Sequence, residues 1–352
     1  MPKPLKVAPQ LDPLSVKGLP FSHFNTLIEK WGGRDALVGK STAQVSEMYL
    51  KPMTIGTQGS LIATYYASEI ESLRALPQNA TWFVSHAWGC PFLDTLDALT
   101  DFFGDRGLED PIVWFDLFSN PQHGTASKPF EWWQTVFLEA VKTIGSVVMI
   151  LQPWEDPVPL RRCWCVYELY ACKTTNSQFD FAVTFEQKEE FLRWLLTHVE
   201  TFFMKFHDVS SRFSKSTNPK DRKAIFKVIK KNIGFLQLDL LVLDTVRDWV
   251  RRILTQKIKE AKVNDKGELT EEVQKWINAL MKFNKTEKVF DEAVRRAKKL
   301  FGKRTSCVLQ CGSMMMGPES DEDKAERLAR RLRKNRWRKA KARFLTCGRM
   351  RD

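Results

Sequence analysis

The sequence predicts an α/β protein built on a doubly wound, mostly parallel sheet with helices on both of its faces. Between residues 81 and 186, short apolar runs rich in β-forming residues alternate with longer runs of helical periodicity. This alternation is typical of parallel β-α units. The short runs are almost continuously apolar, which is the pattern expected of strands buried on both faces.

Four strands and three intervening helices are expected in this region. The strands are predicted at residues 81–86, 111–118, 145–151 and 179–185, and the helices at residues 92–103, 130–144 and 164–172. In the second helix Phe130, Trp133, Phe137 and Val141 recur at helical spacing, which indicates one apolar side that packs on the sheet.

The segments before this region differ from it in composition. Residues 1–20 hold five of the sixteen prolines and are expected to form a flexible arm. Residues 21–80 are expected to form a helical lead-in, with one helix around residues 24–31 and another around residues 65–76. The pair Gly32-Gly33 is the predicted stop of the first of these helices.

After residue 186 the strand signals fade and helical signals take over. Residues 187–301 are therefore expected to form a helical extension, in which Asn218 followed by Pro219 is typical of a helix start. Thr270, followed by two glutamates, predicts a later helix start. Residues 302–352 are interpreted as a linker and a basic tail.

The net charge of +13 is concentrated in that tail. Residues 324–345 contain eleven lysines and arginines against one acid, Glu326. The tail could bind an anionic partner (RNA, a lipid surface or an acidic protein), act as a nuclear signal, or be a solvated terminus without a dedicated partner. Its charge says little about the main fold.

The cysteines and the apolar runs bear on the compartment. The seven cysteines follow no regular spacing, which favours a reducing intracellular environment. The first residues lack a signal-peptide core, and no apolar run approaches the roughly 18 residues needed to span a bilayer. A cytoplasmic location is expected, with the nucleus as the alternative suggested by the tail.

Candidate functional residues follow the predicted strands. Ser85, His86 and Trp88 end the first strand, and Asp116 ends the second. After the third strand comes CWCVYELY, in which Trp164 and Glu168 lie four residues apart, the spacing of neighbours on one face of a helix. Ligands of open α/β sheets bind at the carboxyl edge of the strands, where these residues are expected.

The motifs at the ends of these strands and at the start of the third helix together resemble a TIR domain. The family pattern has a FISHA-type first strand, an FLD-type second strand and a WCxxEL helix, and the chain offers FVSHAW, VWFD and WCVYEL in that order over about a hundred residues. The fuller pattern, with KPMT at residues 51–54, SHAW, the FEWW helix and a helical region after the sheet, also resembles a TIR-like group found in uncharacterised proteins of protists, algae and fungi. The resemblance implies a flavodoxin-like, TIR-like fold over residues 81–186.

TIR domains are either self-associating adaptors or enzymes that cleave the nicotinamide-ribose bond of NAD. Similarity to the enzymes implies that Glu168 is the catalytic carboxylate, with NAD as substrate rather than cofactor and with assembly through TIR-TIR contacts. Ser85, His86, Trp88 and Asp116 would then lie along the nucleotide. By the same comparison Trp164 would line the site, and Phe130 would close it.

Each of these residues also has a structural interpretation. The two tryptophans suit core packing, and Glu168 can be a solvated surface carboxylate. Asp116 can cap the following turn, and His86 can be a structural histidine. Nothing in the spacing of histidines and cysteines predicts a metal site. Three functions follow from the sequence: an NAD glycohydrolase acting through Glu168, a non-enzymatic TIR scaffold, and a nucleic-acid-associated protein that acts through its tail.

Overall fold

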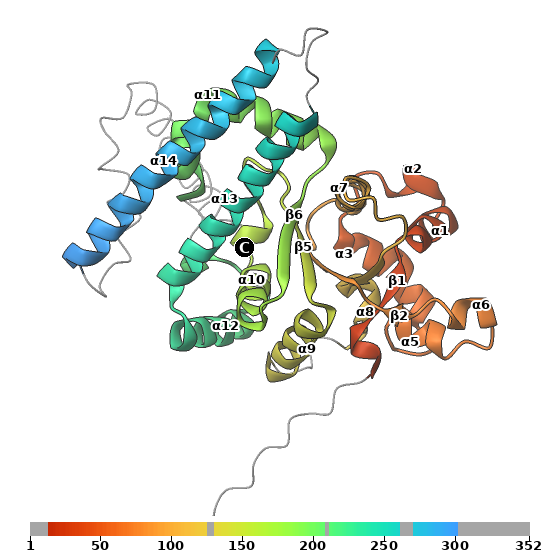
Figure 1. Cartoon of the computed structure of the whole chain (residues 1–352). Coiled ribbons are helices and arrows are strands. Elements are labelled where there is room, and N and C mark those ends of the chain that lie inside the picture. The colour runs from red at the N-terminus through yellow and green to blue at the C-terminus, as the bar shows by residue number, and fades with distance from the viewer. Residues whose placement is uncertain (1–12, 125–129, 208–210, 261–269, 302–352) are drawn as a thin grey trace, which may run out of the picture. The chain divides into compact units, whose positions relative to one another are not determined.

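The computed structural model describes residues 13–124, 130–207, 211–260 and 270–301 (Figure 1). The chain divides into two units, residues 1–286 and 287–352, and all contacts given below lie in the first. The basic tail predicted at residues 324–345 lies outside the described residues.

A six-stranded sheet organises the first unit. In spatial order its strands are β2 (Gln78–Asn79), β1 (Lys17–Pro20), β4 (Ile112–Phe115), β3 (Trp82–Ser85), β5 (Ser146–Ile150) and β6 (Gln178–Ala182). The last four pair in parallel, with Val84 opposite both Phe115 and Val148. Strand β1 pairs antiparallel with both β4 and β2, and β2 forms one edge of the sheet. The predicted α/β class with a mostly parallel sheet is therefore confirmed.

Strand β1 differs from the expectation that residues 1–20 are a flexible arm. Residues 13–16 form the short helix η1 (Pro13–Val16), and β1 then pairs with β4 through Leu19 and Val113. The approach is so close that a Cβ atom on Gly18 would lie 2.4 Å from the carbonyl oxygen of Val113. The high proline content of residues 1–20 led to the prediction of a flexible arm, although these residues include a four-residue strand. Gly18 has no side chain, which lets the backbones of β1 and β4 approach each other.

Helices cover both faces of the sheet. On one face, α7 (Phe92–Gly104), α1 (Ser22–Lys30) and α8 (Asp116–Ser119) share a core with β3 and β4. On the other face lie α9 (Phe130–Ile144) and α10 (Cys163–Thr175). The predicted lead-in contains further short helices: α2 (Gly33–Leu37), α3 (Thr42–Val45), η2 (Ser46–Leu50), α4 (Lys51–Thr54), α5 (Leu61–Tyr66) and α6 (Glu71–Arg74). The single helix expected around residues 65–76 is thus two helices with a break between them.

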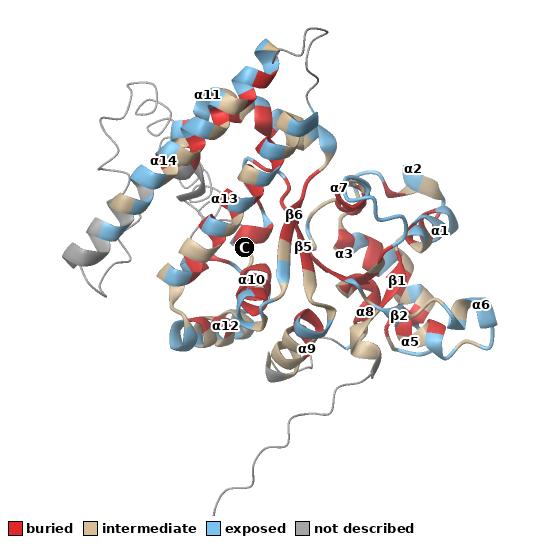
Figure 2. Ribbon diagram, in the orientation of Figure 1, coloured by how far each residue is buried: buried red, intermediate tan, exposed pale blue. Residues whose placement is uncertain are grey.

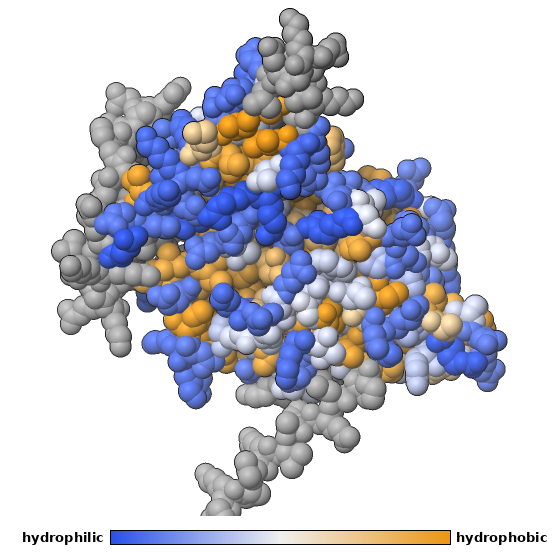
Figure 3. All heavy atoms as spheres, viewed as in Figure 1, coloured by the Kyte–Doolittle hydropathy of each residue, from blue (hydrophilic) through white to orange (hydrophobic). Residues whose placement is uncertain are grey.

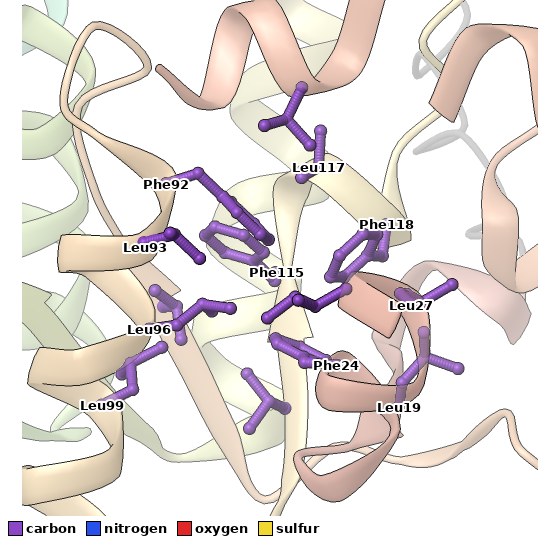
Figure 4. Packing of buried hydrophobic residues seen from close by; sticks show 14 of the residues in the cluster. Leu19, Phe24, Leu27, Phe92, Leu93, Leu96, Leu99, Phe115, Leu117 and Phe118 are labelled. Atoms are coloured by element: carbon purple, nitrogen blue, oxygen red, sulfur yellow. The ribbon is translucent and has the colours of Figure 1, made fainter. Parts of the chain in front are cut away.

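Aromatic and leucine side chains fill the first core. Phe24 of α1 packs edge-on against Phe118 of α8, with ring centroids 4.8 Å apart, and lies near Phe115 of β4 (Figure 4). Leucines of α7 approach the same rings. The lead-in is therefore part of the core of the sheet and not a separate module.

The predicted helical extension is confirmed as helical. It consists of α11 (Phe185–His207), η5 (Ser211–Phe213), α12 (Pro219–Asn232), α13 (Phe235–Glu260) and α14 (Glu271–Phe301). Helix α12 starts as the sequence predicts, because the Asn218 side chain accepts a hydrogen bond of 3.0 Å from the amide of Lys220. Helix α13 packs against β6, where the rings of Trp249 and Phe181 lie 6.1 Å apart.

Buried residues lie mainly in the sheet and on the helix faces that pack against it. All the strands except the exposed β2, and also α10, are buried along most of their length (Figure 2). On the face seen in Figure 3, hydrophilic residues are spread across the surface with smaller hydrophobic areas between them. Within the described part of the chain, no helix combines the length and the apolar character needed to cross a membrane.

Candidate functional site

The candidate residues meet at the carboxyl edge of the parallel strands. Ser85 is the last residue of β3, and Asp116 directly follows β4. Glu168 lies on α10, the helix that follows β5 and the short helix η4 (Pro159–Arg161). Strand β3 stands between β4 and β5 and is parallel to both, so their carboxyl ends lie together.

Glu168 is buried, with 6% of its surface exposed. The hydroxyl of Ser85 donates a short hydrogen bond to its Oε2. Burial raises the pKa of Glu168 to about 8; the Ser85 hydrogen bond and the charge of Arg162 lower it, and the charge of Asp116 raises it. The carboxyl of Glu168 is therefore mostly protonated at neutral pH, and a bound cation would favour its ionised form.

Asp116 is the second carboxyl of the site. It accepts a hydrogen bond from the indole Nε1 of Trp88, and its Oδ1 lies 3.5 Å from Nδ1 of His86. Burial raises the pKa of Asp116 to about 7, although the bond from Trp88 acts in the opposite direction. Since 18% of its side chain is exposed, Asp116 lies nearer to solvent than Glu168 does.

His86 is neutral in this environment. Burial, together with the smaller effect of the positive charge of Arg162, lowers its pKa to about 3. The ring packs against Phe115, with centroids 4.5 Å apart. Neither Nε2 of His86 nor Oδ1 of Asp116 has a hydrogen-bond partner among the described residues, although both atoms are buried.

Phe130 and Trp164 form a separate aromatic group. Their rings lie 5.6 Å apart, and the indole of Trp164 also lies 5.3 Å from the ring of Phe137. Burial raises the pKa of Asp221, at the start of α12, and a hydrogen bond from the side chain of Trp164 to Asp221 opposes this shift. Within the described residues, no hydrogen bond or ring contact joins this group to Ser85, His86 or Asp116.

The structure adds two residues that the sequence reasoning did not single out. The thiol of Cys165 donates to the carbonyl oxygen of His86 at 3.4 Å, and burial raises its pKa well above the usual value. The charge of Arg162 lowers the pKa of both Asp116 and Glu168. A pair of arginines directly before CWC was the available signal for a cation at the start of this helix.

The arrangement offers two carboxyls, one cation and one neutral imidazole at a single sheet edge. Such a group can stabilise a developing positive charge and hold a proton near neutral pH. Among the described residues, no three histidine, cysteine or acidic side chains lie where they could hold a metal ion together.

Comparisons with protein-family models, with curated proteins and with solved structures find no match for this chain.

Proposed function

We propose that the chain is a TIR-like NAD glycohydrolase in which Glu168 is the catalytic carboxylate. The observation that carries the proposal is a buried carboxyl, bonded to Ser85 and flanked by Asp116, at the carboxyl edge of a parallel sheet. Counted along the chain, the four parallel strands run in the order 2-1-3-4. This order supports the flavodoxin-like part of the proposal, because it matches the first four strands of the flavodoxin order 2-1-3-4-5. Sheets of that type bind ligands at the point where the direction of winding reverses.

The proposed reaction breaks the bond between C1 of the ribose and the nicotinamide nitrogen. The bonding electron pair stays on that nitrogen, so nicotinamide leaves as a neutral molecule and needs no acid. The ribose develops oxocarbenium character, which the ionised Glu168 stabilises. Water then adds to C1 and releases one proton, giving ADP-ribose.

The electrostatics of the edge suit this substrate. A pyridinium cation near Glu168 lowers the pKa of its carboxyl, as any opposite charge does, and so produces the anion that the reaction needs. Trp88, held by Asp116, is the proposed aromatic face for a base. His86, Phe130 and Trp164 keep their proposed roles along the nucleotide, the last two as an aromatic wall on α9 and α10.

The test is nicotinamide release by the purified full chain incubated with NAD. Because assembly through TIR-TIR contacts is part of the proposal, the protein is assayed at high concentration and with a crowding agent. We expect release by the wild type and a loss of at least about 100-fold in Glu168→Gln, the scale of one electrostatic group in an active site. Glu29→Gln, an exposed glutamate on α1, is the matched control and is expected to keep full activity. Equal release by wild type and Glu168→Gln would exclude Glu168 as the catalyst.

One observation favours a second candidate, a scaffold that signals by self-association without catalysis. Glu168 accepts a hydrogen bond from Ser85, and the ring of Trp164 packs against Phe130 and Phe137. These contacts are consistent with a structural role for both residues. Under this proposal neither wild type nor variant releases nicotinamide. Light scattering would instead show an assembly that Glu168→Gln weakens together with the fold.

A further inference from the structure

Helix α12 carries a continuous face of lysines. Between residues 211 and 238, eight lysines and arginines stand against one acid, Asp221. Since successive residues of a helix are about 100° apart, five lysines of α12 fall within an arc of roughly 100°. All five are exposed, and together they form the lysine face: Lys220, Lys223, Lys227, Lys230 and Lys231.

The opposite side of α12 is packed into the protein beside α10 (Figure 1). Ile225 and Ile229 are buried and share a hydrophobic cluster with Tyr170 of α10. At the end of the helix, the side-chain amide of Asn232 donates to the hydroxyl of the same tyrosine at 3.1 Å. This packing determines which side of α12 meets solvent, so the lysine face is a fixed part of the surface.

The charge of the lysine face is not balanced within the described part of the chain. None of its ammonium groups forms an ion pair or a hydrogen bond with a described residue. The acid of the segment, Asp221, instead accepts a hydrogen bond of 3.1 Å from the side chain of Asn218. Lys227 is four residues from both Lys223 and Lys231, a spacing at which like charges destabilise a helix. A polyanion along this face would remove that repulsion.

An exposed aromatic ring stands beside the first turn of α12. Phe213, in η5, is 76% exposed, the highest value among the large hydrophobic residues that the structure describes. Its turn is fixed to the helix, because Arg222 donates to the carbonyl oxygen of Ser214 at 2.9 Å and to that of Arg212 at 3.2 Å. The side chains of Arg212 and Lys215, on either side of the ring in the chain, are exposed. A ring held in water among cations is suited to stacking on a nucleic-acid base.

Nucleic acid fits these features better than a lipid surface does. A basic helix that binds a membrane buries its apolar face among the lipids. The apolar face of α12 is already buried against α10, so the helix cannot insert in that way. Lysines bind phosphate as point charges, without reading the base sequence. An exposed ring stacks on a base whose own face is free, which favours a single strand over a duplex.

We propose that the lysine face of α12 binds the phosphate backbone of a single-stranded nucleic acid, one base of which stacks on Phe213. From Lys220 to Lys231 the face is about 17 Å long, at about 1.5 Å per residue. That length suits a site of several nucleotides. Binding is independent of base sequence and weakens with salt, because the contacts are made to phosphates. The surface shares no residue with the candidate site, and the inference does not depend on the proposed enzymatic function.

The test is fluorescence anisotropy of the full chain with a labelled oligothymidine of about 15 nucleotides, over a range of salt concentrations. The triple variant Lys223→Gln/Lys227→Gln/Lys230→Gln neutralises the centre of the lysine face. We expect its affinity to fall at least tenfold. The slope of log K against log salt should decrease by about 2, since each phosphate contact to a single strand contributes about 0.7.

The matched control removes three exposed cations from α1, α6 and α13, as Lys30→Gln/Arg74→Gln/Lys259→Gln. It is expected to change the affinity less than threefold. The basic residues 324–345 are present in every variant, so any binding through them is common to all. Circular dichroism checks that each variant is folded.

Phe213→Ala tests the stacking contact separately. We expect it to weaken binding of the single strand at least fivefold and to leave binding of a duplex of the same length unchanged, because the base faces of a duplex are already stacked on one another. Phe213→Trp should retain the wild-type affinity. The residue is exposed, so neither change disturbs the core.

Four outcomes would overturn the inference. They are no binding of the oligonucleotide by the wild type, the same affinity and salt slope in the triple variant and its control, single-strand binding by Phe213→Ala that equals the wild type, and tighter binding of phosphatidylserine vesicles or polyglutamate than of the oligonucleotide. The variants of the lysine face are expected to leave any nicotinamide release unchanged, so this inference and the proposed enzyme fail separately.

Discussion

The pKa of Glu168 results from interactions that act in opposite directions. Removal from water favours the neutral carboxyl, while the Ser85 hydroxyl and the Arg162 charge favour the anion. Burial prevails and raises the pKa to about 8. The residue therefore holds its proton at neutral pH and can lose it when a cation arrives.

The first prediction concerns stability against pH. In the unfolded chain Glu168 loses its proton near its ordinary pKa of 4.5, whereas the folded protein keeps it until about pH 8. Between these values the folded state binds more protons, so the free energy of unfolding falls as pH rises from about 4.5 to 8. Each tenfold change in proton affinity is worth about 1.4 kcal/mol.

Urea unfolding at pH 5, 6, 7 and 8 measures this slope. Glu168→Gln should flatten it, leaving the smaller part contributed by Asp116, whose pKa is also raised. Glu29→Gln should keep the wild-type slope because that side chain is exposed. An unchanged slope in Glu168→Gln would contradict the assigned pKa.

The second prediction concerns Ser85. Ser85→Ala removes the hydroxyl that donates to Glu168 and leaves a buried carboxyl oxygen without that bond. We expect a loss of about 1–3 kcal/mol in the free energy of unfolding. A double-mutant cycle with Glu168→Gln should show coupling of at least about 0.5 kcal/mol, and additive effects would mean that the bond contributes nothing.

At this scale the sequence predicted the positions of the site residues better than their contacts. The ends of apolar runs place Ser85 and Asp116 at the sheet edge, because that depends only on strand boundaries. Which partner each side chain finds depends on packing between distant segments. The Ser85–Glu168 bond spans 83 positions, and the contact of Trp164 with Asp221 joins two helices.

At the element scale, Asp180 of β6 ties the sheet to two helices. Its carboxylate, only 6% exposed, pairs with Arg106 from the turn that follows α7 and with Arg252 from α13. Asp180→Ala leaves two guanidinium groups without this partner. Since both arginines are partly exposed, we expect a loss of about 2 kcal/mol rather than the 3–5 kcal/mol of a fully buried pair.

The control for Asp180 is Asp248, which pairs with Arg251 along the exposed side of α13. Asp248→Ala should cost less than about 0.5 kcal/mol, as exposed ion pairs do. Chemical denaturation measures the loss in the free energy of unfolding for both variants. Equal losses would show that Asp180 contributes no more to stability than an exposed ion pair does.

Elements were predictable where periodicity is long and unpredictable where they are short. Helices α7 and α9 follow apolar patterns of two or more turns. Strand β1 has four residues, two of which are Gly18 and Pro20, and its pairing is set by β4, more than ninety residues away. Local sequence carries no signal for that pairing.

At the scale of the molecule, the helical extension is bound to the sheet by buried aromatic contacts. Trp249 of α13 is 3% exposed and lies between Phe181 of β6 and Phe191 of α11, with ring centroids 6.1 and 5.2 Å away. Trp249→Ala should therefore cost about 3–5 kcal/mol. Hydrogen exchange should show faster exchange in β6 as well as in α13. Loss of protection in α13 alone would mean that the extension is a separate folding unit.

In the proposed reaction the buried carboxyl of Glu168 acts once it is ionised. The pH profile of nicotinamide release from NAD measures this ionisation. We expect kcat/KM to rise between pH 6 and 9 with an apparent pKa near 8, and Ser85→Ala to move this pKa upward because the hydrogen bond that lowers it is gone. A rate that does not change with pH, or a profile that Glu168→Gln leaves intact, would contradict this role of Glu168.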